Sequence, residues 1–471
     1  MKSFFQKIIF IALALVLLLF AFSSCRFIDD SIHEGKGEGF SQIKVSDLDP
    51  FEISWREAVQ PETDWGVDGA SYKPIVHGYE WGASMDGIVV RVGAQTSPTA
   101  NQFTVRQVRG SALTITDVYS CDGAGNRASG TEYVYLGIEV VPNNFIVVGT
   151  TGWVDFASRL NVTYNEVALE YEGVISPDTD SLRKGVYYGE NSEIGVSAYE
   201  NLAEDNGKNA LIVWLHGGGE GGYNLNLPAL GNEASALWRD EIQSYFQRDG
   251  RSGAYVLAPQ CPTAWMDSGV NDGMNTAVEN GHQSSYYTKD LTSAIMAYVK
   301  GNADVDTSRI YVGGCSNGGY MTLELLFNNP DYFAAAFPIC PGYKEINVSN
   351  AMVESIKDVP TWFVQAFNDI ILPPNKYASP LYARLLDKNA NNAYFSMFDK
   401  VVGKDAVGKS YIGHYAWVYA FNNEVKNVQS RENITYSTEA ENYGFVPNSV
   451  GGTEKVGEYD GLWDWLAGQR K

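Results

Sequence analysis

Histidine and cysteine are both scarce in this chain, with five of each among 471 residues. Apart from Cys25, the cysteines are Cys121, Cys261, Cys315 and Cys340, and they lack the paired spacing of a metal-binding module. We therefore expect no metal site and no cofactor. Spacing does not assign a disulfide among the last three cysteines, and we expect buried free thiols.

Positive charge is also in short supply. The chain carries 34 Lys and Arg against 56 Asp and Glu, which gives a formal net charge of −22. Contacts to phosphate need a basic surface, so this balance argues against a nucleic-acid partner. The acidity favours solubility instead.

A membrane-length apolar run is missing. The longest uncharged apolar stretch, residues 8–22, has 15 residues and follows Lys2 and Lys7. That length suits the apolar core of a signal peptide better than a membrane span or an uncleaved anchor. Small residues then precede Cys25, as in bacterial lipoprotein signals, although Phe22 replaces the usual leucine. We expect cleavage after residue 24 and lipidation of Cys25. The protein would be a periplasmic or cell-surface lipoprotein, or secreted, with no other membrane contact.

The remaining chain has two halves of different texture. Between about residues 43 and 165, short β-like stretches alternate with turn signals, and no helix-length amphipathic segment interrupts them. The stretches are 87–92, 103–108, 113–119 and 133–140. Short strands at this spacing predict a β-sandwich, which we assign to residues 36–175.

After a linker near residues 177–181, apolar strands alternate with helical segments. Expected strands are 210–215, 254–258, 309–313, 334–339, 361–366 and 393–398, and expected helices are 290–300, 320–328, 379–387 and 462–467. Continuous apolar strands between helices predict a mostly parallel sheet covered on both faces. We therefore expect an α/β domain over residues 183–471.

The sequence Gly-Cys-Ser-Asn-Gly at 314–318 joins one of these strands to a helix. A serine at such a sharp strand-to-helix turn is exposed at the sheet edge, beside a helix N-terminus. The flanking glycines permit the strained backbone. The motif is weak alone, but its context makes Ser316 a candidate nucleophile that requires a base and an acid.

The small number of histidines selects the base. In an α/β sheet the partners follow the serine in chain order, and of the five histidines only His414 follows Ser316. The alternative is a surface histidine. For the acid, Asp369 stands directly after the strand 361–366, where it can face His414. Asp399 is the second candidate, and a simple turn-forming role is the alternative for Asp369.

A glycine-rich stretch, His-Gly-Gly-Gly-Glu-Gly-Gly at 216–222, follows the strand 210–215. The N–H groups of Gly218 and Asn317 can then form an oxyanion hole. A flexible turn is the alternative, and we expect His216 to brace the loop. Trp265 is a weaker candidate for contact with substrate, with core packing as the equal alternative. Residues 272–287 could form a lid or a solvated loop.

These motifs carry a family resemblance. The stretches 216–220, 258–262, 305–321, 330–342 and 368–369 resemble esterases of the poly(3-hydroxybutyrate)-depolymerase and feruloyl-esterase-like group of α/β-hydrolases. Residues 79–82 and 103–105 are similar to the Ig-like N-terminal domain of some bacterial members. The resemblance implies a serine carboxylesterase with Ser316, Asp369 and His414 as its triad. Gly221 stands where the group often has an arginine.

We therefore expect a carboxylic-ester hydrolase that acts on small-molecule, glycan or polyester esters. One alternative is an exported serine peptidase of the same fold, although the first half shows no repeated propeller blades. The other is a surface binding protein with a catalytically degenerate hydrolase half. The intact set of serine, histidine and aspartate argues against degeneracy.

Overall fold

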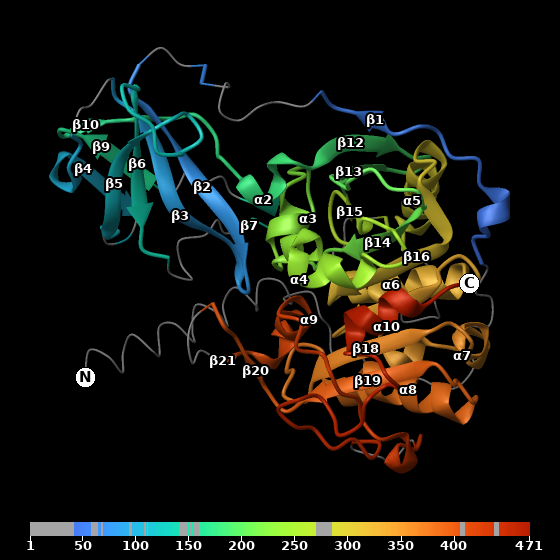
Figure 1. Cartoon of the computed structure of the whole chain (residues 1–471). Coiled ribbons are helices and arrows are strands. Elements are labelled where there is room, and N and C mark those ends of the chain that lie inside the picture. Colours follow the sequence, from blue (N-terminus) through green and yellow to red (C-terminus); the bar gives the residue numbers. More distant parts are fainter. Residues whose placement is uncertain are drawn as a thin grey trace, which may run out of the picture.

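The computed structural model describes residues 42–57, 65–66, 69–93, 97–107, 110, 112–140, 148–149, 152–153, 160–269, 285–405, 410–437 and 442–471. The expected signal segment with Cys25, and most of the segment 272–287, lie outside these ranges. Within them, no helix is long and apolar enough to cross a membrane. Figure 1 shows a β-rich body beside a larger body of mixed helices and strands.

The β-rich body is built from two sheets. A five-stranded sheet has the order β11-β2-β3-β6-β5, and a three-stranded sheet has the order β10-β9-β4. The strands are β2 (Ser71–Tyr79), β3 (Gly82–Arg91), β4 (Phe103–Gln107), β5 (Ile115–Cys121), β6 (Tyr133–Ile138), β9 (Leu160–Tyr164), β10 (Val167–Ala168) and β11 (Glu170–Tyr171). A separate short hairpin joins β7 (Val148–Gly149) to β8 (Gly152–Trp153).

One apolar core joins the two sheets. Met85, Ile88 and Val90 of β3 cluster with Val105 of β4 and Val162 of β9, and all five are buried. Apolar side chains from both inner faces therefore fill the space between the sheets, as in a β-sandwich. This arrangement of two packed sheets agrees with the β-sandwich that the sequence predicted.

The larger body contains a nine-stranded sheet with the order β1-β12-β13-β15-β14-β16-β17-β18-β19. Its strands are β1 (Ser54–Trp55), β12 (Arg183–Tyr188), β13 (Glu193–Tyr199), β14 (Asn209–Leu215), β15 (Ala254–Gln260), β16 (Val305–Cys315), β17 (Ala335–Ile339), β18 (Thr361–Ala366) and β19 (Ala393–Phe398). The run from β15 to β19 is parallel throughout, and β1, β12 and β13 pair antiparallel.

Helices cover both faces of this sheet, as the continuous apolar strands require. Along β14, Leu211 and Val213 enter one apolar cluster, whereas Ile212 and Trp214 enter the other. The first cluster includes residues of α5 (Thr288–Gly301), α6 (Asn317–Asn328), α7 (Asn350–Ile356) and α8 (Ala378–Asp387); the second includes residues of α4 (Asp240–Gln243), α9 (Trp417–Phe421) and α10 (Leu462–Gly468).

The chain enters the large sheet before it forms the sandwich. Strand β1 pairs with β12, although its residues fall in the range that we assigned to the sandwich. Just upstream, the N–H groups of Ile43 and Val45 donate to the side chains of Asn328 and Asn329. The expected linker contains the short helix α2 (Pro177–Asp180), and the short helix α3 (Leu227–Leu230) follows β14. The domain boundaries themselves remain predictions.

The long segment between α9 and α10 protects the edge of the sheet. The N–H of Met397 in β19 donates to Gly451 O at 2.7 Å, and the N–H of Gln429 donates to Phe395 O at 2.8 Å. An edge strand otherwise exposes unpaired backbone groups that invite association with other chains. This polar segment therefore has a structural role that its sequence did not reveal.

Candidate active site

The sequence-predicted functional residues gather at one edge of the large sheet. Strands β14, β16, β17, β18 and β19 are parallel neighbours, so their carboxyl ends lie along the same edge. Gly218 follows β14, Ser316 follows β16 and Asp369 follows β18. His414 lies in a short 3-10 helix (Gly413–Tyr415) after β20 (Val401–Val402) and β21 (Ser410–Tyr411). Ligand sites in open α/β sheets form at this edge.

Ser316 occupies the sharp turn that its motif predicted. Its backbone has φ 56° and ψ −113°, a conformation that residues other than glycine rarely adopt. Helix α6 begins at the next residue. The Ser316 N–H donates to Ile339 O at 3.0 Å, and Ser316 O accepts from Gly342 N–H at 2.9 Å. Hydrogen bonds on both sides hold the strained residue, which remains partly exposed. Strain retained in this way is characteristic of functional positions.

Asp369 and His414 form a hydrogen-bonded pair. His414 Nδ1 lies 2.9 Å from Asp369 Oδ2, and the carboxylate is fully buried while the imidazole is 11% exposed. Asp369 Oδ1 accepts the backbone N–H groups of Ile371 and Leu372 at 2.9 and 3.0 Å. The acid is therefore fixed by its own loop, and it holds the imidazole so that Nε2 is left for chemistry. Asp399 is exposed and accepts from the N–H of the residue that follows it.

Cys340 links the serine to the histidine. Its thiol donates to His414 O at 3.2 Å, and the backbone N–H of Ser316 also interacts with the sulfur. Burial raises the pKa of this thiol well above its usual value, so the sulfur stays protonated. The structure thus brings Ser316 and His414 to the same buried side chain. Sequence reasoning gave Cys340 no role, because its position depends on the packing of three strand ends.

One group of side chains in the described ranges has the spacing to hold a metal ion. Ligand atoms of Cys340, Asp369 and His414 lie within 4.8 Å of one another. The carboxylate and the imidazole are already bonded to each other, and the Cys340 thiol donates to His414 O. The hydrogen bonds among these groups account for the cluster without a metal.

The glycine-rich loop packs directly against the serine turn. A Cβ on Gly318 would lie 1.9 Å from Leu215 O, so the start of α6 touches the end of β14. This contact places the loop that carries Gly218 beside Asn317, the first residue of α6. Gly218 is partly exposed, as an N–H donor for a substrate oxygen must be. The two expected oxyanion donors therefore belong to adjoining segments.

His216 braces this loop, as we expected. It is fully buried, and burial lowers its pKa to about 4, so the imidazole is neutral. Nδ1 lies 2.6 Å from Gly217 O, and Nε2 lies 3.3 Å from the backbone N of Cys261. With the proton on Nδ1, both contacts are satisfied hydrogen bonds. His216 therefore ties the loop to the segment after β15 and is not available as a second base.

Glu220 is a buried acid in the same loop that sequence reasoning did not single out. Burial raises its pKa to about 7, against the smaller opposing effect of the N–H groups of Gly217 and Gly219 and its own N–H. A carboxyl group in contact with several loop N–H groups helps to fix the loop. Its position in the glycine-rich motif was a signal that could have been followed.

Trp265 lies in the core. Its side chain is fully buried and packs against His216 and Tyr287, at ring-centroid distances of 4.8 and 6.2 Å. The backbone N–H of Trp265 donates to Asn317 Oδ1 at 2.6 Å. This packing corresponds to the core alternative, and Trp265 supports the residue that bears the oxyanion N–H. Cys121, Cys261, Cys315 and Cys340 are all buried free thiols.

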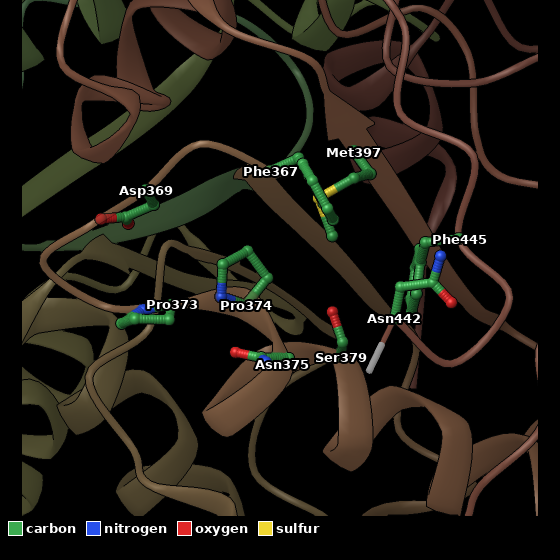
Figure 2. A pocket seen from close by; sticks show the side chains of 9 residues that line it. All are labelled: Phe367, Asp369, Pro373, Pro374, Asn375, Ser379, Met397, Asn442 and Phe445. Carbon is green, nitrogen blue, oxygen red and sulfur yellow. The ribbon is translucent and has the colours of Figure 1, made fainter. Parts of the chain in front are cut away.

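A cavity of about 160 Å³ lies beside the acid, and Figure 2 shows the side chains that line it. Its lining residues are Phe367, Asp369, Pro373, Pro374, Asn375, Ser379, Met397, Asn442 and Phe445. The Asp369 carboxylate points away from the other lining side chains (Figure 2), consistent with its bond to His414. The cavity therefore lies behind the acid and does not include Ser316 or the glycine-rich loop.

Comparisons with known proteins agree with this fold. A profile of the prolyl oligopeptidase family matches residues 277–349, which include Ser316. No curated protein sequence matches the chain. Among solved structures, a thermostable esterase is 22% identical, with a TM-score of 0.57, over 75% of this chain and 96% of that one.

Two further structures are more distant. An acetyl xylan esterase from Aspergillus awamori is 18% identical, with a TM-score of 0.30, over 45% of this chain and 79% of its own. An acylaminoacyl peptidase from Pyrococcus horikoshii is 13% identical, with a TM-score of 0.37, over 72% of this chain and 68% of its own. The thermostable esterase carries the fold comparison: the chain has an α/β-hydrolase fold joined to a β-sandwich, and its site has the composition of a serine hydrolase.

Proposed function

We propose that this protein is a serine carboxylesterase. The observation that carries the proposal is the Asp369–His414 pair, bonded at 2.9 Å, which shares the sheet edge and the Cys340 contact with Ser316. A fixed acid, an oriented imidazole and a serine at a strained turn are the parts required for acyl transfer. The match to the thermostable esterase, which spans 96% of that protein, supports esters as the substrate class.

The reaction follows from the placement of these groups. Ser316 Oγ attacks the ester carbonyl while His414 Nε2 takes its proton, and the Asp369 carboxylate stabilises the imidazolium. The N–H groups of Gly218 and Asn317 stabilise the oxyanion. His414 then protonates the departing alcohol, which leaves an acyl-enzyme. Water, activated by the same imidazole, attacks that ester and releases the acid and Ser316.

The cellular setting is proposed from the sequence alone. Residues 1–24 have the pattern of a lipoprotein signal, with Cys25 as the lipidated residue. We place the enzyme outside the cytoplasm, as an anchored or secreted protein. Candidate substrates are small-molecule esters and the esters of glycans or polyesters. The Ig-like character of the sandwich and the kinship with poly(3-hydroxybutyrate) depolymerases belong to this proposal.

A peptidase is the second candidate, because the family profile that matches residues 277–349 is that of prolyl oligopeptidases. Against it, the described residues of the first half form a small sandwich of eight strands in two sheets, and they show no repeated blades of a propeller. The two candidates differ on p-nitrophenyl esters and peptide p-nitroanilides assayed in parallel. If the protein hydrolyses the peptide p-nitroanilides and not the esters, it is a peptidase and the carboxylesterase assignment is wrong.

The nucleophile assignment has its own prediction. Ser316→Ala should lower kcat on p-nitrophenyl esters by on the order of 10⁴–10⁶, because the acyl-enzyme can no longer form. Its thermal unfolding midpoint should be equal to or above that of the wild type, since the strained position loses only a hydroxyl. Equal inactivity of wild type and variant on a broad ester panel, with both binding a glycan, would instead indicate a degenerate binding protein.

A further inference from the structure

The β2–β3 hairpin of the sandwich carries a buried acid at its tip. Tyr79 pairs with Gly82, so Glu80 and Trp81 form the two-residue turn. Glu80 is 0% exposed although it stands at the end of a hairpin. In Figure 1 this end of β2 reaches toward α9 and β20–β21 of the hydrolase body. The turn is therefore inserted into the other domain.

The Glu80 carboxyl group is surrounded by donors from the hydrolase domain. Oε1 accepts the Lys404 N–H and the Asn422 side-chain amide, both at 2.7 Å. Oε2 accepts the Tyr411 hydroxyl at 2.9 Å and the Asp405 N–H at 3.2 Å. In return, the Glu80 N–H donates to Asp405 Oδ2 at 3.0 Å. Such a fully satisfied buried network specifies one arrangement of the segments that it joins.

Those segments flank the catalytic histidine. Tyr411 precedes His414 by three residues, and Trp417 follows it by three. Trp417 Nε1 donates to Glu80 O at 3.2 Å, and its ring meets the His414 ring edge-on at 5.9 Å. Tyr415 lies between, with its ring 5.5 Å from that of Tyr411 and 4.5 Å from that of Trp417. Glu80 thus binds the histidine segment on both sides of the reacting ring.

Within the described residues, the hydrolase domain also holds the histidine segment at points of its own. The short strands β20 and β21 pair with each other and with no other described strand, and residues 406–409 between them lie outside the described ranges. The histidine segment contacts the sheet through the bond of His414 to Asp369, the contact of His414 O with Cys340, and the packing of Gly413 against the backbone of Asn368 and Asp369. Ala416 and Trp417 also belong to the second apolar cluster. The hairpin tip adds a further fixed point, which a second domain provides.

We propose that Glu80 is a positioning residue of the active site, so that the sandwich domain completes the catalytic machinery of the hydrolase domain. Glu80 touches neither the nucleophile nor the expected substrate. It holds the segment 411–417, and through it the His414 imidazole, in register with Asp369 and Ser316. A displacement of about 1 Å in a catalytic group can cost on the order of 10²-fold in rate. The inference rests on the proposed function of the site.

The test compares Glu80→Ala and Glu80→Gln in the full chain with Glu132→Ala. That control removes a half-exposed carboxylate of the same domain, whose Oε2 lies 3.1 Å from Arg91 Nε. Each is assayed for kcat and KM on p-nitrophenyl acetate and for the rate at which a fluorophosphonate labels Ser316. We expect Glu80→Ala to lower kcat and labelling 10- to 100-fold with KM within threefold. Glu80→Gln, which keeps one acceptor oxygen, should recover part of the loss, and Glu132→Ala should match the wild type.

A folded Glu80→Ala with kcat and labelling within twofold of Glu132→Ala would overturn the proposal. If Glu80→Ala does not fold, Tyr411→Phe serves as the test. This variant removes one hydrogen-bond donor to Glu80 and keeps the aromatic ring. We expect its kcat to be threefold to tenfold lower at constant KM. Wild-type rates for it would again overturn the proposal.

The labelling assay also separates this inference from the ester assignment. A wild type that is labelled at Ser316 but hydrolyses no ester contradicts the carboxylesterase function, while the labelling rates of the Glu80 variants still decide the positioning role. A wild type that is neither labelled nor active overturns both.

Discussion

At the scale of single residues, the two oxygens of Asp369 have separate tasks. Oδ1 is occupied by two backbone N–H groups, and Oδ2 faces His414 Nδ1. The loop therefore decides which oxygen meets the histidine. Because the Oδ1 position must hold a hydrogen-bond acceptor, an asparagine at this position can take only the orientation that points its amide oxygen at the two N–H groups.

This constraint predicts a large effect of Asp369→Asn. The amide oxygen should take the Oδ1 position and accept both N–H groups, which leaves the amide NH₂ facing His414. The imidazole would then accept at Nδ1 and carry its proton on Nε2, so it could not take the proton of Ser316. We expect kcat on esters to fall by about 10⁴.

The matched control is Asp399→Asn, the other acid that follows a strand on this side of the sheet. Its side chain is exposed and bonds locally, so kcat should stay within twofold of wild type. A larger loss in Asp399→Asn than in Asp369→Asn would reverse the assignment of the acid.

Sequence order was sufficient to propose Ser316, Asp369 and His414, because strand ends of a parallel sheet converge and only one histidine follows the serine. It was not sufficient for Glu80 or Cys340. The role of Glu80 arises from donors more than 300 positions away in the chain, and no local pattern marks such a contact.

At the scale of elements, the turn before α6 has no spare room. A Cβ on Gly318 would lie 1.9 Å from Leu215 O and 2.6 Å from His216 O, both backbone atoms. Backbone cannot yield as a flexible side chain does. The helix can therefore approach the end of β14 only because residue 318 lacks a side chain.

We predict that Gly318→Ala separates α6 from the glycine-rich loop and lowers both activity and stability. The expected loss is at least tenfold in kcat and several degrees in the thermal unfolding midpoint, measured by ester turnover and by calorimetry. Gly219→Ala is the control, because a Cβ there meets nothing within 4 Å. A midpoint for Gly318→Ala equal to that of Gly219→Ala would contradict the close contact.

In the hydrolase half, the strands that the sequence predicted are those with continuous apolar runs, β14 to β19, and their observed bounds differ by a few residues. The β12–β13 hairpin was missed, since antiparallel strands near a sheet edge bury alternate residues, as the mixed pattern of Arg183–Tyr188 shows. Strand β1, with two residues, is too short to give any periodic signal.

At the scale of the whole molecule, two buried acids couple stability to pH. Burial raises the pKa of Glu220 to about 7, and burial, aided by the charge of Asp405, does the same for Glu233. Each folded pKa lies above the ordinary value of 4.5. The stability associated with the protonated forms is therefore fully present below pH 4.5 and is lost as pH rises through 7.

We expect the thermal unfolding midpoint of the wild type to decrease as the pH is raised from 5 to 8. Glu220→Gln should make this decrease smaller. A neutral amide does not have to ionise in a buried site, so the variant should gain a few degrees at pH 8 and little at pH 5. Calorimetry at both values checks this, with the exposed Glu170→Gln as control. A Glu220→Gln midpoint that follows the wild type at both values would show that Glu220 does not titrate in this window.

The position of β1 makes the sandwich an insertion within the hydrolase sheet, since β1 precedes it in the chain and β12 follows it. Ser54 pairs with Val186, and the intervening chain must close as a loop. Closing a flexible loop of roughly 130 residues costs about 4 kcal/mol in chain entropy by logarithmic scaling. A sandwich that has already folded brings its two ends near each other and removes most of that cost. We therefore expect the sandwich to fold before β1 pairs with β12, although β1 leaves the ribosome first.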